Sequence, residues 1–201
     1  FCEKISLFSM LGEKGEYSNQ IKKGLPKNVS CKFIKKKRSP TILKRRFLDH
    51  VSNNKVLGVY KINDDALNNK QDILVGKSLK KILPNYDLVI VSDYGHGFIS
   101  NKNAKIICRY SKYLALNAQI NAANVGYHSM RNYKNIDCVI INNREIHHEM
   151  RDRSTETELL MKRLSIQQNI KNLIVTKGSE GAVIYNKKNK KFNFCEAFAD
   201  T

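Results

Sequence analysis

The stretch Leu88-Val-Ile-Val-Ser-Asp-Tyr-Gly-His-Gly97 decides the fold class of this chain. Its first four residues are all apolar, which is typical of a strand buried in a parallel sheet. The serine, aspartate and glycines that follow end the strand in a turn. Helices are predicted on both sides of it, at Ala66–Leu83 and, capped by Ser100, at Asn101–Ser111. The stretch therefore predicts one strand of an α/β fold.

The same rhythm continues in both directions from this stretch. Strands are predicted at Ile5–Leu11, Tyr113–Leu116, Val139–Ile141 and Leu173–Val175, and helices at Glu13–Gly24, Arg144–Met150 and Thr155–Gln168. A closing antiparallel hairpin is predicted from Ala182–Tyr185 and Lys191–Phe194. Strands that alternate with helices predict a largely parallel sheet with helices on both faces.

Residues 29–62 break this rhythm, because short alternating strands follow one another without a helix. Ser39-Pro40 interrupts the first of them, and Ser52-Asn53-Asn54 is typical of a hairpin turn. We interpret the segment as a small sheet that projects from a single domain of residues 1–201.

Composition narrows the class of protein. The 201 residues are 41% hydrophobic, enough for a core, and no apolar run is long enough to span a membrane. The net charge of +18 allows a nucleic-acid-binding module as an alternative function, although the basic residues are spread along the whole chain. Five cysteines without a C-x-x-C pair favour reduced thiols and a cytoplasmic protein.

Polar residues follow the predicted strands at the places where open α/β sheets bind ligands. They are Asp93, Asn117, the pair Asn142 and Glu145, and the turn Thr176–Gly181. A carboxylate three residues after a strand-end amide suits hydrated Mg²⁺ near phosphates, but the same spacing also predicts a helix capping box. For Asp93, a role in ligand binding and a place in an ordinary strand-to-helix turn are equally good interpretations.

The turn after the strand Leu173–Val175 reads Thr-Lys-Gly-Ser-Glu-Gly. It offers backbone amides, a hydroxyl and a lysine to an anion, which suits a nucleotide phosphate. It does not match G-x-x-x-x-G-K-[ST], so the sequence excludes a P-loop.

Four motifs in this order resemble the PfkB or ribokinase carbohydrate kinases. They are Pro40–Phe47, Ser92–Gly97, the N-x-x-E of Asn142 and Glu145, and Val175–Gly181. The chain is most similar to the heptose-phosphate kinase branch. The resemblance implies a partial ribokinase-like α/β domain over residues 1–201, with a small β lid at about residues 29–62. It also implies transfer of phosphate from ATP to a sugar or sugar phosphate.

The resemblance also implies residue roles. Asn142 and Glu145 would place Mg²⁺ and the phosphates, while the nucleotide would contact Asn117, Thr176 and Gly178. The substrate would contact three further residues, Lys44, Arg46 and Asp93. The family's G-A-G-D motif, which carries the catalytic base, is expected beyond Thr201, so we expect the chain to be a fragment without a catalytic residue of its own.

Partners follow from the same resemblance. We expect a sugar or sugar-phosphate substrate, a homodimer formed through the lid strands, and a fused nucleotidyltransferase domain in the full-length parent. Neither a membrane nor a nucleic acid is the expected partner. Two alternatives stay open: a nucleoside or hexose kinase of the same fold, and a non-catalytic basic module that binds nucleic acid.

Overall fold

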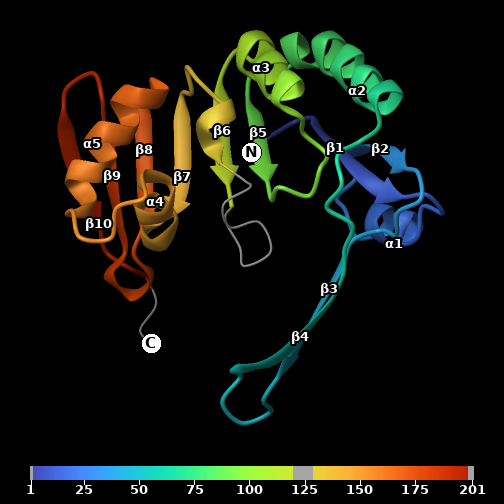
Figure 1. The fold of residues 1–201 in the computed structure, drawn as a ribbon, viewed down its shortest axis with the longest axis horizontal. Coiled ribbons are helices and arrows are strands. Elements are labelled where there is room, and N and C mark those ends of the chain that lie inside the picture. Colours follow the sequence, from blue (N-terminus) through green and yellow to red (C-terminus); the bar gives the residue numbers. More distant parts are fainter. Residues whose placement is uncertain (1, 120–128, 199–201) are drawn as a thin grey trace. The chain divides into compact units, whose positions relative to one another are not determined.

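A computed structural model describes residues 2–119 and 129–198 (Figure 1). They form two compact units, one of residues 2–75 with 96–98 and one of residues 76–95 with 99–119 and 129–198. The predicted lid segment falls in the first unit. Among the described residues, no helix combines the length and the apolar content needed to cross a bilayer.

The helices and strands follow the predicted order. The first unit contains β1 (Ile5–Gly12), α1 (Ser18–Lys23), β2 (Val29–Lys36), β3 (Leu43–Leu48) and β4 (Lys55–Lys61). Helix α2 (Asn69–Ile82) leads into the second unit. The second unit continues with η1 (Leu83–Asn85), β5 (Val89–Asp93), α3 (Asn101–Tyr110), β6 (Leu114–Ala118), η2 (Met130–Asn132), β7 (Cys138–Asn142), α4 (Asn143–Met150), α5 (Thr157–Gln168), β8 (Asn172–Thr176), η3 (Gly178–Glu180), β9 (Ala182–Asn186) and β10 (Lys191–Cys195).

The second unit is built on a six-stranded sheet with the order β10-β9-β8-β7-β6-β5 (Figure 1). Strands β5 to β8 are parallel, while β9 and β10 form the predicted antiparallel hairpin against β8. The carboxyl ends of β5, β6, β7 and β8 therefore lie at one edge of the sheet. The largely parallel sheet predicted from the sequence is confirmed.

Only one face of this sheet is buried among the described residues. Leu116, Val139 and Leu173 are at most 1% exposed, beneath a layer that includes α4 and α5 (Figure 1). On the opposite face Ile90 is 71% and Ile140 is 42% exposed. The prediction of helices on both faces is wrong for this part of the chain. Because neighbouring strands follow in chain order, right-handed crossovers place every connecting helix on the same side.

The first unit differs from its prediction in two places. The helix predicted at Glu13–Gly24 begins only at Ser18, because Gly15 and Tyr17 have φ angles of 68° and 67°, outside the helical region. Strand β2 was expected within the lid, but it pairs in parallel with β1. The lid hairpin is therefore β3 and β4 alone, within residues 43–61.

The hairpin β3–β4 has two chemically different faces. Lys44 lies opposite Tyr60 and Arg46 opposite Gly58, so the two basic residues share one face. Phe47 pairs with Leu57 on the other face, where both side chains are more than half exposed. An isolated two-stranded hairpin is at best marginally stable in water, which makes this apolar face a candidate contact surface.

Candidate active site

Polar residues from four strands line the carboxyl edge of the sheet in the second unit, as predicted. Asn142 at the end of β7 is the register partner of Thr176 at the end of β8, and Asp93 on β5 is the partner of Ala118 on β6. Three strand spacings separate β5 from β8, or roughly 14 Å. The edge therefore offers two subsites, one at β7–β8 and one at β5–β6.

Asn142 and Glu145 form a capping box at the start of α4. The Asn142 side-chain oxygen accepts from the backbone N–H of Glu145 at 2.9 Å. In return, the Glu145 carboxylate accepts from the backbone N–H of Asn142 at 2.8 Å. Glu145 is only 6% exposed, whereas Asn142 is exposed at the edge. The capping alternative considered from the sequence is thus realised. The proposed role of the pair near Mg²⁺ and phosphates stays a prediction.

The turn after β8 depends on its glycines. Gly178 has a φ of 62° and Gly181 one of 83°, values that L residues rarely adopt. A Cβ atom on Gly181 would lie 2.0 Å from the Cys195 carbonyl oxygen, whereas one on Gly178 would meet open space. The backbone of Gly178 is therefore accessible beside the exposed Thr176, as a contact to phosphate requires.

Asp93 is held by two donors. Its side chain is mostly buried; Oδ1 accepts from the Gly95 amide at 3.0 Å and Oδ2 from the Tyr133 hydroxyl at 2.7 Å. Burial, together with the Asp93 carboxylate, raises the pKa of Tyr133, which keeps this hydroxyl a neutral donor. Asp93 thus fixes the turn after β5. Its predicted contact with substrate is a separate role that stays a prediction.

The remaining predicted site residues lie in different settings. Asn117 is half-buried on the open face of the sheet, and its amide donates to the Ile140 carbonyl at 2.8 Å. Lys44 and Arg46 share one face of the lid hairpin in the first unit. On the same face Lys55 donates to Tyr60 at 2.9 Å and lowers the Tyr60 pKa. The hairpin thus carries a basic face, and contact of Lys44 and Arg46 with substrate, like that of Asn117 with nucleotide, stays a prediction.

The family of the chain follows from comparison with known proteins. Residues 4–201 match the family described as pfkB family carbohydrate kinase. The chain belongs to this family. Among curated proteins, a search found no match to the sequence.

Solved PfkB-type structures share the fold. A ribokinase from Giardia lamblia has a TM-score of 0.71 at 16% identity, over 98% of this chain and 60% of that one. Phosphofructokinase-2 from Escherichia coli in complex with potassium has a TM-score of 0.73 at 12% identity, over 98% and 63%. Its complex with fructose-6-phosphate gives 0.67 at 14%, over 96% and 62%. The likeness shows a ribokinase-like fold. This chain spans less than two thirds of the length of each of these relatives.

Sequence reasoning missed Tyr133, which is 1% exposed and holds Asp93 across 40 positions of the chain. It also missed Glu149, whose buried carboxylate accepts from the Ser129 hydroxyl and the Met130 amide. No local spacing indicates either contact, because each joins residues that are about 20 or more positions apart in the sequence. Tyr133 thus supports Asp93 at the carboxyl edge of this PfkB-family sheet, while Glu149 holds the segment at Ser129 and Met130. The sequence also offers Asn121 and Asn124 after Asn117, whose amides would suit a phosphate, but both lie outside the described residues.

Proposed function

We propose that the protein transfers a phosphoryl group from ATP to a hydroxyl of a sugar or sugar phosphate. Membership of the pfkB family of carbohydrate kinases supports the reaction class. The observation that carries the proposal is the gathering of Asp93, Asn142 and Thr176 at one edge of a parallel sheet. Ligands of such sheets bind beyond the carboxyl ends of the strands.

The two subsites divide the work between nucleotide and sugar. At β7–β8 the accessible backbone of Gly178 and the hydroxyl of Thr176 bind ATP phosphates, with Asn117 one strand away on the side of β6. At β5–β6 the turn fixed by Asp93 receives the sugar. The separation of roughly 14 Å between β5 and β8 leaves room for a triphosphate between the two subsites.

Oxygen donors at the end of β7 fit a magnesium ion. Mg²⁺ prefers oxygen ligands and keeps several waters, so the buried Glu145 carboxylate and the Asn142 amide would hold it through its hydration shell. When bound, the ion neutralises phosphate charge. The capping box contributes by fixing both side chains before ATP arrives, which lowers the ordering cost of binding.

The lid favours a substrate that already carries a phosphate. Lys44, Arg46 and Lys55 lie on one face of the β3–β4 hairpin, and a phosphate is the partner that such a cluster suits. A heptose phosphate, as in the branch that the motifs resemble, meets this requirement, whereas a nucleoside or a free hexose does not.

Labelled ATP and a panel of substrates test the proposal. We expect transfer from γ-labelled ATP to sugar phosphates, heptose phosphates included, to exceed transfer to free hexoses and nucleosides. Lys44→Ala with Arg46→Ala should raise KM for the phosphorylated sugar, whereas Lys22→Ala with Lys23→Ala, at exposed positions of α1, removes the same charge and serves as the matched control. Equal preference for free sugars would contradict the assignment of the lid, and an absence of ATP binding would contradict the kinase.

The apolar face of the lid supports a homodimer formed through the hairpins. Phe47 is 51%, Leu57 54% and Val59 50% exposed, and all three lie on one face. One E. coli phosphofructokinase-2 structure is described as a tetrameric inhibited form, so assemblies occur in the fold family. Light scattering should show a dimer that Phe47→Ser with Leu57→Ser converts to monomers. Unchanged mass in the variant would exclude this interface.

A further inference from the structure

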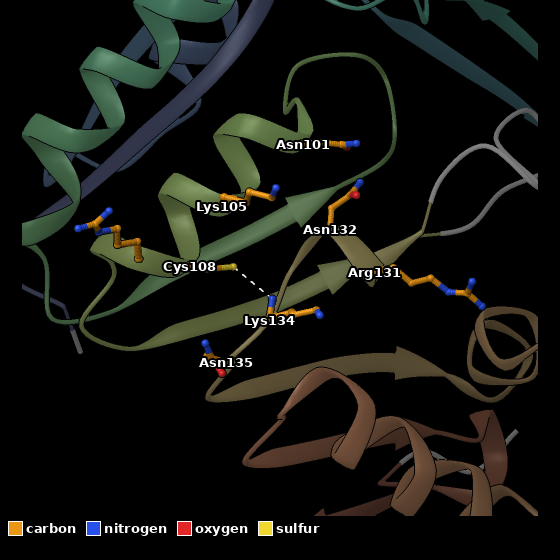
Figure 2. Close-up of a pocket in the computed structure, with 8 residues that line it drawn as sticks. Asn101, Lys105, Cys108, Arg131, Asn132, Lys134 and Asn135 are labelled. Atoms are coloured by element: carbon orange, nitrogen blue, oxygen red, sulfur yellow. Dashed lines mark hydrogen bonds between the residues drawn. The ribbon is translucent and has the colours of Figure 1, made fainter.

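A groove outside the candidate active site opens between α3 and the segment that enters β7 (Figure 2). It lies wholly in the second unit and has a volume of about 520 Å³. Its end at Arg109 and Asn135 lies toward the amino ends of the strands, away from Asn142 and Thr176. The lining residues are Asn101, Lys105, Cys108, Arg109, Arg131, Asn132, Lys134 and Asn135.

The groove is basic and its lining contains no carboxylate. Of its four cationic side chains, Arg131 is satisfied by Glu149 at 3.5 Å and points away from the groove in Figure 2. Lys105 and Arg109 lie four residues apart on α3, where like charges repel each other. Within residues 2–119 and 129–198, Lys105, Arg109 and Lys134 form no ion pair. The Arg109 guanidinium lies 5.8 Å from the centre of the Tyr110 ring, so the uncompensated charges of the groove are the two lysines, one on each wall.

Amides add neutral donors to these charges. Figure 2 shows Lys105 on α3 and Asn132 on the facing segment directed into the space between them. The Asn101 and Asn132 side chains have no hydrogen bond within the described part of the chain. Asn135 is different, since its oxygen accepts from Asn169 and leaves its NH₂ group for a ligand. The donors thus come from both walls of the groove.

The walls are held in place without a ligand. The Lys134 amide donates to the Cys108 sulfur at 3.4 Å across the floor of the groove (Figure 2). Between the two lining residues Asn132 and Lys134, Tyr133 is buried and donates to Asp93. The backbone that carries the donors is thus in place before an anion binds, and only the exposed side chains must be ordered.

We propose that this groove binds a small anion carrying two or more phosphate groups. Cations on both walls can each neutralise one phosphate, and charge-assisted hydrogen bonds are the strong ones. The volume is that of a small-molecule site. No aromatic residue lines the groove, so it offers no surface on which nucleic-acid bases stack.

Calorimetry with inorganic tripolyphosphate tests the proposal on the full chain. Lys105→Ala with Lys134→Ala should weaken binding about tenfold or more, since each lysine contributes a hydrogen bond to a charged group. The control is Lys188→Ala with Lys191→Ala, which removes the same charge from exposed positions of the β9–β10 hairpin. Circular dichroism checks that both double variants fold.

Each outcome decides between sites. Selective weakening in the groove variant supports the proposal, whereas equal weakening in the control shows general charge attraction and overturns it. Binding that Gly178→Val abolishes and the groove variant leaves intact belongs to the candidate nucleotide turn, and also overturns it. So does a groove that fails to bind tripolyphosphate but captures a twelve-residue DNA oligonucleotide, because the site would then be a nucleic-acid surface.

Discussion

The two faces of the six-stranded sheet contrast within single strands. Val139 on β7 is 0% exposed, and its neighbour Ile140 is 42% exposed although it is equally apolar. Both residues belong to one uninterrupted hydrophobic run, which local sequence cannot divide into two environments. The division comes from topology, since right-handed crossovers between strands in chain order place the helices on one side. An apolar sequence thus indicates which residues can be buried, whereas the connections between strands determine which of them are buried.

The largest expected effect tests that contrast directly. Leu173→Ala removes a fully buried side chain from the covered face and should destabilise the fold by about 2–5 kcal/mol. Ile140→Ala, on the open face, should cost about 1 kcal/mol or less, because water already reaches its side chain. Urea unfolding of both variants measures the difference. Equal losses would show that something covers the open face in solution.

A smaller effect is expected from a buried hydrogen bond on the covered side. Tyr133→Phe leaves the Asp93 carboxylate without its donor at 2.7 Å and should cost about 1–3 kcal/mol. Tyr17→Phe, at a 44% exposed tyrosine, is the control and should change stability little. If urea midpoints of the two variants agree, the Tyr133 bond does not hold the turn at Asp93.

The same contrast explains what the sequence could predict. Residues 88–97 and the motif at Asn142 and Glu145 indicate strand ends, and the carboxyl ends of parallel strands share an edge whatever their order. Strand order itself is not local, so the bare face around Ile90 was not foreseen. Nor was the pairing of β2 with β1, because an apolar run does not specify whether its partner strand is parallel.

The candidate site follows the same division. Asn142 and Thr176 could be placed from their own neighbours, since each directly follows a predicted strand. Tyr133 could not, because its contact with Asp93 depends on how the crossover before β7 packs. Candidate binding residues are thus easier to predict from the sequence than the residues that hold them in position.

On the open face a lost hydrogen bond should cost less. Asn117→Ala breaks the bond from its amide to the Ile140 carbonyl, but water can replace the donor at this half-buried position. We expect a loss of about 1 kcal/mol or less in unfolding free energy. If Asn117 also contacts nucleotide as proposed, ATP affinity falls while the fold persists. Calorimetry and urea unfolding on the same sample separate the two results, and unchanged ATP affinity would remove Asn117 from the site.

The smallest expected effect concerns one carboxylate that serves a buried and an exposed partner. Asp137 accepts from the backbone amide of Leu114 at 2.8 Å and from the Lys171 ammonium at 2.6 Å. The Lys171 side chain is 71% exposed. The hydrogen bond to Asp137, and then its charge, raise the Lys171 pKa above its ordinary value of 10.5. Because the Lys171 pKa is higher in the folded than in the unfolded protein, the pair contributes its full stabilisation below pH 10.5, the ordinary pKa. That contribution is lost as the pH rises through the higher pKa of the folded protein.

Lys171→Met removes only the exposed half of this arrangement. The urea midpoint of the variant should lie slightly below that of the parent from pH 7 to 9, and the gap should close above pH 10.5 as the parent loses its ion pair. The bond from the Leu114 amide to Asp137 is present in both proteins, so the gap between them reports Lys171 alone. A gap that stays constant to pH 11.5 would mean that Lys171 stabilises the strand through its aliphatic stem rather than its charge.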